Sequence, residues 1–105
     1  IDMALKEFQE AARVNPEFSP AATAVGWIFF EKGQVDTALD FFSKALKADP
    51  DDASATFGVG QVYDRKRKPE IAAEHYHRAL ELERDPVKKT SILNFIDKLI
   101  DWGVS

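Results

Sequence analysis

The sequence predicts an all-α fold built from repeated pairs of antiparallel helices, and three observations support this prediction. A pattern of small and aromatic residues returns every 34 residues without a gap. Within each segment, the apolar residues follow the spacing of one helical face. Dipeptides such as Asn15-Pro16 and Asp49-Pro50 separate the segments, because a residue before proline disfavours helical geometry. A fixed period of this length is typical of proteins in which short helical units stack.

The repeated pattern is easiest to follow from the middle of the chain in both directions. Moving 34 residues along the chain keeps small residues small and aromatic residues aromatic. The forward pairs are Gly26 and Gly60, Phe29 and Tyr63, Ala38 and Ala72, Phe42 and Tyr76, and Ala45 and Ala79. The backward pairs are Ala38 and Ala4, Leu39 and Leu5, Phe42 and Phe8, Ala45 and Ala11, and Pro50 and Pro16.

This pattern resembles the tetratricopeptide repeat (TPR), which runs Trp-x-x-Leu-Gly-x-x-Tyr, then Ala-x-x-x-Phe, then Pro. The matching residues are Val25, Gly26, Phe29, Ala38, Phe42 and Pro50, and then Val59, Gly60, Tyr63, Ala72 and Tyr76. Two features depart from it: Ala22 and Thr56 replace the Trp, and Pro86 follows two residues later than the period requires. The resemblance covers residues 3 to about 86. It implies a right-handed superhelical TPR solenoid of antiparallel helix pairs.

We expect one TPR domain over residues 1–105. Residues 1–18 hold the second helix of a partial repeat, residues 19–52 and 53–86 are two full repeats, and residues 87–105 hold a closing helix. Such a helix covers the last apolar face of a stack of repeats. Because the chain opens inside a repeat, we expect the natural protein to continue upstream.

Each helix has a predicted beginning and end. The helix over residues 2–14 ends at Asn15-Pro16. Ser19-Pro20 opens a helix over residues 20–32, with serine as its N-cap and proline in its first turn. Gly33 then forms a turn with positive φ, and the partner helix covers residues 35–48.

The second full repeat follows the same plan. Asp52 is the expected N-cap of a helix over residues 53–66. Arg67 occupies the turn position that Gly33 has in the preceding repeat, and Pro69 begins the helix over residues 69–84.

A last helix covers residues 86–102. Its predicted core stripe consists of Ile92, Phe95, Ile96, Leu99 and Trp102. Leu93 and Ile100 widen this stripe, which leaves two alternatives. These residues are either part of a wide buried face with scattered exposed apolar side chains, or they form a further contact surface.

Composition excludes several classes of function. Apolar residues make up 45% of the chain, which is enough for a core. The net charge of −4 argues against a nucleic-acid partner, which would need a basic surface. Without cysteine there are no disulfides and no thiolate chemistry. No apolar run is long enough to insert into a membrane. The compartment stays open, with the cytoplasm as the default.

No arrangement of residues predicts catalysis, a cofactor or a metal site, so we expect no enzyme. His75 and His77 are two residues apart and point to different sides of a helix. The acidic residues Asp49, Asp51 and Asp52 suit helix capping better than calcium binding. The basic run 65–68 is either a solvated turn or a contact for an acidic peptide or phosphate.

The resemblance implies that a partner segment binds in a concave groove lined by the first helices of the repeats. The groove residues it implies are Thr23, Trp27, Phe30, Glu31, Phe57, Gln61, Asp64 and Arg65. Periodicity adds that the helix over residues 20–32 is apolar nearly all round, since Trp27 and Phe30 lie away from the stripe that contains Val25. Trp27, Phe30 and Phe57 either form one aromatic binding patch, or Trp27 and Phe57 pack together as core between repeats.

The predicted function is a non-catalytic protein–protein interaction module that binds a partner peptide through apolar and aromatic anchors. Repeats that hold the acidic C-terminus of Hsp70 or Hsp90 use a carboxylate clamp of Lys, Asn and Arg. Of the groove positions here, only Arg65 suits that clamp, so the resemblance implies a groove without it. The alternative is structural self-association, as a homo-oligomer or scaffold, through the open ends at Ala4–Phe8–Ala11 or Leu93–Ile100.

Overall fold

The structure, a computed structural model, describes residues 19–101, with side chains described for residues 21–99. This part of the chain contains helices and no strand, as predicted. The helices are α2 (Ser19–Glu31), α3 (Val35–Ala48), α4 (Ala53–Arg65), α5 (Pro69–Leu82) and α6 (Pro86–Asp101). The helix expected over residues 2–14 and the side chain of Trp102 lie outside the described residues.

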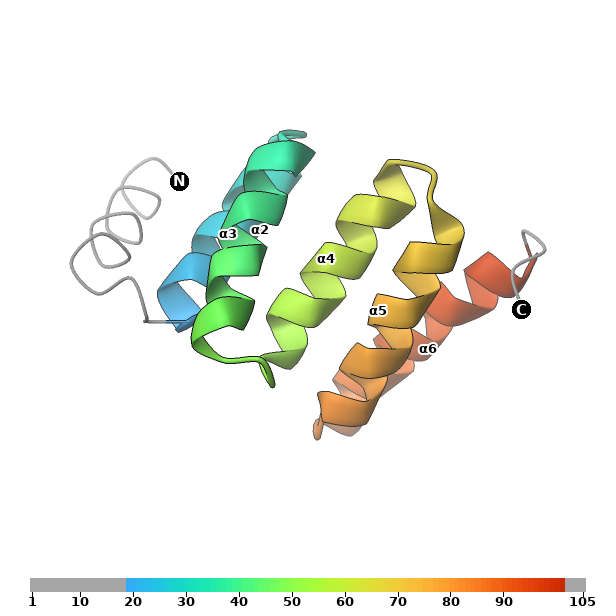
Figure 1. The fold of residues 1–105 in the computed structure, drawn as a ribbon. Coiled ribbons are helices and arrows are strands. Elements are labelled where there is room, and N and C mark those ends of the chain that lie inside the picture. The colour runs from blue at the N-terminus through green and yellow to red at the C-terminus, as the bar shows by residue number, and fades with distance from the viewer. Residues whose placement is uncertain (1–18, 102–105) are drawn as a thin grey trace.

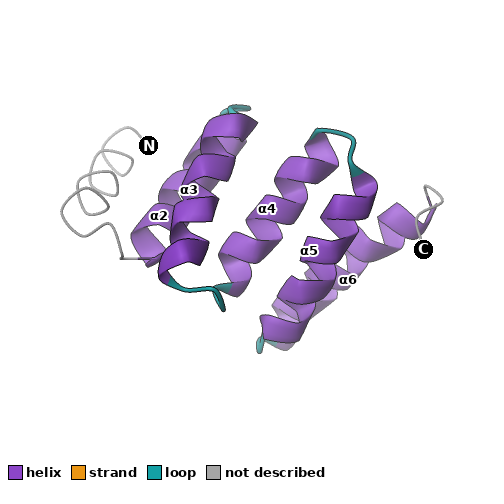
Figure 2. Ribbon diagram, in the orientation of Figure 1, coloured by secondary structure: helices purple, strands orange, loops and turns teal. Residues whose placement is uncertain are grey.

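The helices form a stack in which each packs on the next. The pairs α2 with α3 and α4 with α5 are antiparallel, and α3 joins α4 while α5 joins α6. Figure 1 shows α3 and α5 nearest to the viewer, with α2 and α6 behind them. Figure 2 shows that short loops connect all of these helices. The predicted all-α fold of stacked TPR-like helix pairs is confirmed.

Two wholly buried aromatic rings occupy equivalent places in the core. Phe42 on α3 and Tyr76 on α5 have no exposed surface. Each faces a glycine on its partner helix: a Cβ built on Gly26 would lie 2.7 Å from the Phe42 ring, and one on Gly60 would lie 2.7 Å from the Tyr76 ring. These distances are too short for carbon atoms, which pack at about 3.5–4.0 Å. The helices of each pair therefore approach closely only because these positions lack a side chain.

Phe42 also joins the first helix pair to the second. A Cβ built on Gly58 of α4 would lie 2.6 Å from Cζ of Phe42. The ring therefore packs closely on two glycine positions, Gly26 of α2 and Gly58 of α4. The sequence does not single out Gly58, because the equivalent residues are Ala24 and Ile92 and glycine does not recur at this position.

The two turns inside the helix pairs have the same backbone geometry. Gly33 has a φ of +82°, as predicted, and Arg67 has a φ of +61° at the equivalent place. The N–H groups of Gln34 and Lys68 donate to the carbonyls of Phe29 and Tyr63, at 2.9 Å in both turns. Arginine carries a Cβ in this left-handed region, where glycine is preferred.

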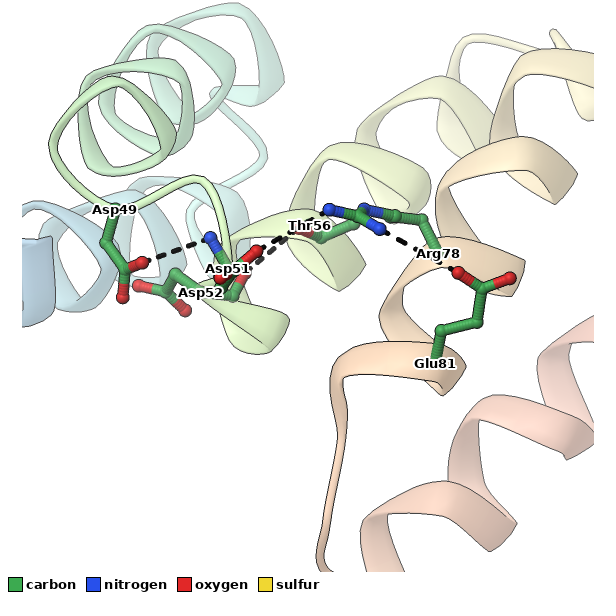
Figure 3. Close-up of polar contacts among 6 residues, drawn as sticks. All are labelled: Asp49, Asp51, Asp52, Thr56, Arg78 and Glu81. Carbon is green, nitrogen blue, oxygen red and sulfur yellow. Dashed lines mark hydrogen bonds and ion pairs between the residues drawn. The ribbon is translucent and has the colours of Figure 1, made fainter.

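The acidic residues between the pairs act as caps. Asp52 is the N-cap of α4, and its Oδ1 accepts the N–H of Ala55 at 3.0 Å, as predicted. Asp49 Oδ1 accepts the N–H of Asp51 at 3.0 Å. Figure 3 shows these carboxylates at the turn before α4, with Arg78 of α5 reaching toward Asp51. The N–O distance between Arg78 and Asp51 is 3.5 Å.

Helix α6 covers α5 with a stripe of Ile92, Ile96 and Leu99, all of which are buried as predicted. Leu93 is 44% exposed, so it widens the apolar surface without joining the core. None of the helices in the described range is long and apolar enough to cross a membrane.

Candidate functional site

A row of aromatic side chains runs across the first helix of each pair and the last helix. Trp27 of α2 and Phe57 of α4 have ring centroids 6.1 Å apart, and Phe57 and Phe95 of α6 have centroids 5.3 Å apart. All three side chains are half-buried. We call Trp27, Phe57 and Phe95 the aromatic row. It places α2, α4 and α6 on one face of the molecule.

Trp27 serves both the core and this face. Its ring centroid lies 5.0 Å from that of Phe42, which anchors it on the core. Its indole N–H donates to Ser54 Oγ at 2.9 Å, across the gap between α2 and α4. Trp27 and Phe57 thus pack on each other between the repeats while each keeps part of its surface exposed.

Phe30 lies below this surface. It is 6% exposed, and its ring is covered on one edge by Trp27, with centroids 5.5 Å apart. The guanidinium carbon of Arg65 lies 4.3 Å from the centre of the Phe30 ring, within the range of a cation–π contact. Arg65 thereby forms the outer layer above Phe30 and remains exposed itself.

The other polar residues implied by the resemblance differ in how accessible they are. Thr23 is 6% exposed, and its hydroxyl donates to Oδ2 of Asp52, the N-cap of α4, at 2.8 Å. The hydroxyl hydrogen of Thr23 is therefore already used within the chain. Asp64 is half-buried and accepts the hydroxyl hydrogen of Tyr76 at 3.0 Å. Gln61 is half-buried and Glu31 is exposed. Thr23 and Asp64 are therefore already engaged in hydrogen bonds within the chain, at the N-terminal and C-terminal ends of α4 respectively.

Burial, together with the carboxylate of Asp64, raises the pKa of Tyr76 well above its ordinary value. Both effects disfavour the phenolate, the first by removing water and the second by charge repulsion. Tyr76 is therefore a neutral donor to Asp64 across the second helix pair.

A hollow of about 220 Å³ lies between α4 and α6, next to the aromatic row. Its walls are formed by Ala53, Ser54, Phe57, Glu83, Lys88, Ser91 and Ile92. We call it the α4–α6 hollow. Only Phe57 among these residues was expected at the site from sequence.

The 34-residue period contains a signal that would have identified three more residues of this face. One further step along the chain takes Trp27 past Gln61 to Phe95, and Phe57 to Ser91. The same step takes Ser54 to Lys88. The period therefore continues from the first helices of the two full repeats into the last helix.

Other polar groups do not gather into a reactive site. His75 is half-buried and its Nδ1 lies 2.9 Å from the carbonyl oxygen of Ile71, while His77 is exposed. Among the described residues, no group of three or more His, Cys, Asp or Glu side chains could hold a metal ion. In the basic run, Lys66 pairs with Asp36 of α3, a contact that raises the pKa of the lysine and joins the two helix pairs.

The comparisons with known proteins agree with this fold. The chain is similar to YrrB, a TPR protein with an unusual peptide-binding site, with a TM-score of 0.81 and 22% identity over 89% of this chain and 46% of YrrB. It is also similar to SycD, a type III secretion translocator chaperone of Yersinia enterocolitica, with a TM-score of 0.84 and 20% identity over 93% of this chain and 70% of SycD.

A third similar structure is the first TPR of Spaghetti (RPAP3) bound to an HSP90 peptide. Its TM-score is 0.80, with 21% identity over 95% of this chain and 79% of that one.

The chain spans less than half the length of YrrB, and at identities of 20–22% the likeness to these three structures establishes the fold alone. The search of curated proteins gave no match. The tetratricopeptide repeat family model matches residues 1–53, just over half of the sequence. Together with the repeated helix pairs, this match means that the chain belongs to the tetratricopeptide repeat family.

Proposed function

We propose that this chain is a non-catalytic protein–protein interaction module that binds a partner segment on the face of α2, α4 and α6. The observation that carries the proposal is the continuous aromatic row, in which Trp27, Phe57 and Phe95 keep exposed surface although they pack on one another. Aromatic residues dominate binding hot spots because they bury a large area at little entropic cost. A partner segment laid across the row would bury this surface.

The charged and polar residues around the row suit the rim of such an interface. Glu31 and Arg65 are exposed near the C-terminal ends of α2 and α4, and Gln61, which lies between Phe57 and Arg65 in the sequence, is half-buried. Rim contacts of this kind determine the orientation and register of a bound segment more than they increase its affinity. The proposed site contains no carboxylate clamp, because Thr23, Trp27, Phe57 and Gln61 supply none of its cations.

The related structures support binding of a protein segment. YrrB is described by its peptide-binding site, and the Spaghetti repeat was solved with an HSP90 peptide. The partner proposed here differs from an acidic C-terminus held by a clamp, since its main anchors are apolar side chains.

The test begins with a displayed library of random 12-residue peptides selected on the wild-type chain. Enriched peptides are labelled, and their dissociation constants are measured by fluorescence anisotropy on three proteins. We expect Trp27→Ala to weaken binding by roughly tenfold or more, which is the usual loss for a central aromatic anchor. Ile71→Ala is the matched control, because Ile71 is a partly exposed apolar residue on α5.

Folding of each variant is checked by circular dichroism, since Trp27 also contacts Phe42 in the core. If Trp27→Ala unfolds the chain, the milder Trp27→Leu takes its place. Equal binding to wild type and a folded Trp27 variant would place the partner away from the aromatic row and refute the proposal.

Self-association is the second candidate function, and it is favoured by the apolar surface of α6. Val87 is 74% exposed and Leu93 is 44% exposed. If a second copy of the chain covers this surface, Leu93→Glu would lower the average mass measured by light scattering at high concentration. A wild-type chain that stays monomeric under those conditions excludes this candidate.

A further inference from the structure

We propose that the α4–α6 hollow receives one apolar side chain of the bound segment, and that Lys88 at its edge selects a carboxylate close to that side chain. This inference rests on the proposed function and adds the chemistry of the partner. It predicts a segment in which a residue such as Leu, Met or Phe is followed or preceded at short distance by Asp or Glu.

The apolar part of the hollow is preformed. Phe57 lies in one wall and is fixed by two further rings, with centroids 5.4 Å away for Tyr76 and 5.3 Å away for Phe95. Ile92 is only 3% exposed, so it belongs to the core below the hollow. Walls that are held by the core need little rearrangement when a ligand enters, and this reduces the cost of binding.

The size of the hollow favours a single side chain. Its volume of about 220 Å³ is below the roughly 300–1,000 Å³ that is typical of sites for small organic molecules. It lies beside the aromatic row, so a segment that crosses Trp27 and Phe57 can place one side chain into it without leaving the face.

The charges at the edge of the hollow are not equivalent. Glu83 Oε1 accepts the N–H groups of Arg84 and Asp85, both at 3.1 Å, so this carboxylate is used to hold the turn between α5 and α6. Lys88 forms no ion pair within residues 21–99. Glu83 thus already has hydrogen-bond donors, whereas the ammonium of Lys88 has no acceptor among residues 21–99 and can pair with a carboxylate of the partner.

Ser54 adds a neutral donor beside this charge. Its Oγ accepts the indole N–H of Trp27, which leaves the hydroxyl hydrogen of the serine without an acceptor among the described side chains. A lysine ammonium and a serine hydroxyl are both hydrogen-bond donors, so together they suit a carboxylate. Since the whole chain has a net charge of −4, selection of an acidic residue must come from this local contact.

The experiment uses the peptides enriched on the wild-type chain and two pairs of variants. Lys88→Glu reverses the charge at the hollow, and Lys89→Glu makes the same change at an exposed neighbour that does not line it. Ser91→Phe fills the hollow from the exposed side of α6, and Asn94→Phe adds the same ring on α6 outside it. Circular dichroism melts establish that all four proteins fold.

We expect both hollow variants to weaken binding of the enriched peptides by roughly tenfold or more, and both control variants to stay within about twofold. A peptide whose Asp or Glu is replaced by Lys should bind Lys88→Glu more tightly than it binds the wild type. Salt should weaken the binding of an acidic peptide to the wild type, because it screens the attraction to Lys88, and should strengthen its binding to Lys88→Glu, because it screens the repulsion.

The outcomes separate this inference from the function on which it rests. If the peptides lose affinity for Trp27→Ala but bind Ser91→Phe and Lys88→Glu as they bind the wild type, the hollow is not used and the binding face remains. If the enriched peptides lack acidic residues, the assignment of Lys88 is overturned. If no peptide is enriched, or if Trp27→Ala leaves the dissociation constants unchanged, both proposals are wrong.

Discussion

Gly58 gives the sharpest test of the packing, because a single methyl group added there would press on a ring that has no space to move. A Cβ at this position would lie 2.6 Å from Cζ and 2.7 Å from Cε1 and Cε2 of Phe42. Carbon atoms pack at about 3.5–4.0 Å. The Phe42 ring or the whole of α4 must therefore shift by about 1 Å to accept alanine.

The ring also packs closely on α2. A Cβ built on Gly26 would lie 2.7 Å from Phe42, so the ring is in close contact with both helices and has little room to move. Phe42 has no exposed surface and thus no path to solvent. Overpacking of this kind costs about 1–3 kcal/mol. Alanine returns at most about 1 kcal/mol through its better helix propensity.

Gly58→Ala is therefore expected to lower the free energy of unfolding by roughly 1–2 kcal/mol. For a domain of this size, that loss lowers the melting temperature by roughly 5–15 °C. Urea denaturation followed by circular dichroism measures the free energy. Combining Gly58→Ala with Phe42→Leu should cost less than the sum of the two single changes, because the smaller side chain relieves the contact.

An unchanged or increased stability of Gly58→Ala would refute this reasoning. Helix propensity would then outweigh packing, and the Phe42 ring would not lie against α4 as described. Strict additivity in the double variant would lead to the same conclusion.

Three further predictions follow from the turns, the cap and the buried tyrosine. Arg67→Gly removes a Cβ from a left-handed backbone and should raise the free energy of unfolding by about 1 kcal/mol in urea denaturation; a loss of stability would contradict the positive φ. Asp52→Ala removes the N-cap of α4 and should cost about 1 kcal/mol in the same assay. Because the pKa of Tyr76 is raised on folding, its neutral form contributes stability below about pH 10, and this stability is lost as the pH rises above that value. Tyr76→Phe should flatten the fall in melting temperature above about pH 10.

Much of the fold could be predicted because the same packing problem recurs at each repeat. Phe42 and Tyr76 are buried against glycines at the same offset, so one period in the sequence locates both contacts. Helix ends were predictable where one residue determines them, as Asp52 does for α4 and Gly33 does for the turn after α2. The helix predicted over residues 35–48 has the bounds of α3.

The remaining features depend on contacts that occur once. Thr23 was assigned to the groove by its place in the repeat, but its hydroxyl bonds to Asp52, which lies 29 residues further along. The residues equivalent to Gly58 in the 34-residue period are Ala24 and Ile92, so the pattern does not require glycine at this position. The α4–α6 hollow arises from the exact approach of two helices, which spacing in a sequence does not determine. The assignment of Thr23, Trp27, Phe57 and the other predicted groove residues to a binding site stays a prediction.

The position of Phe42 between two helix pairs has a consequence for how the chain can be divided. The sequence period suggests that each 34-residue unit is a separate module. In the structure, however, a core ring of the first pair completes its contacts only on the backbone of the second. Unfolding of α4 would expose part of that ring to water, so the two pairs should melt together as one cooperative unit. Any exchange of repeats between related chains would then have to bring a glycine to position 58 along with the helices.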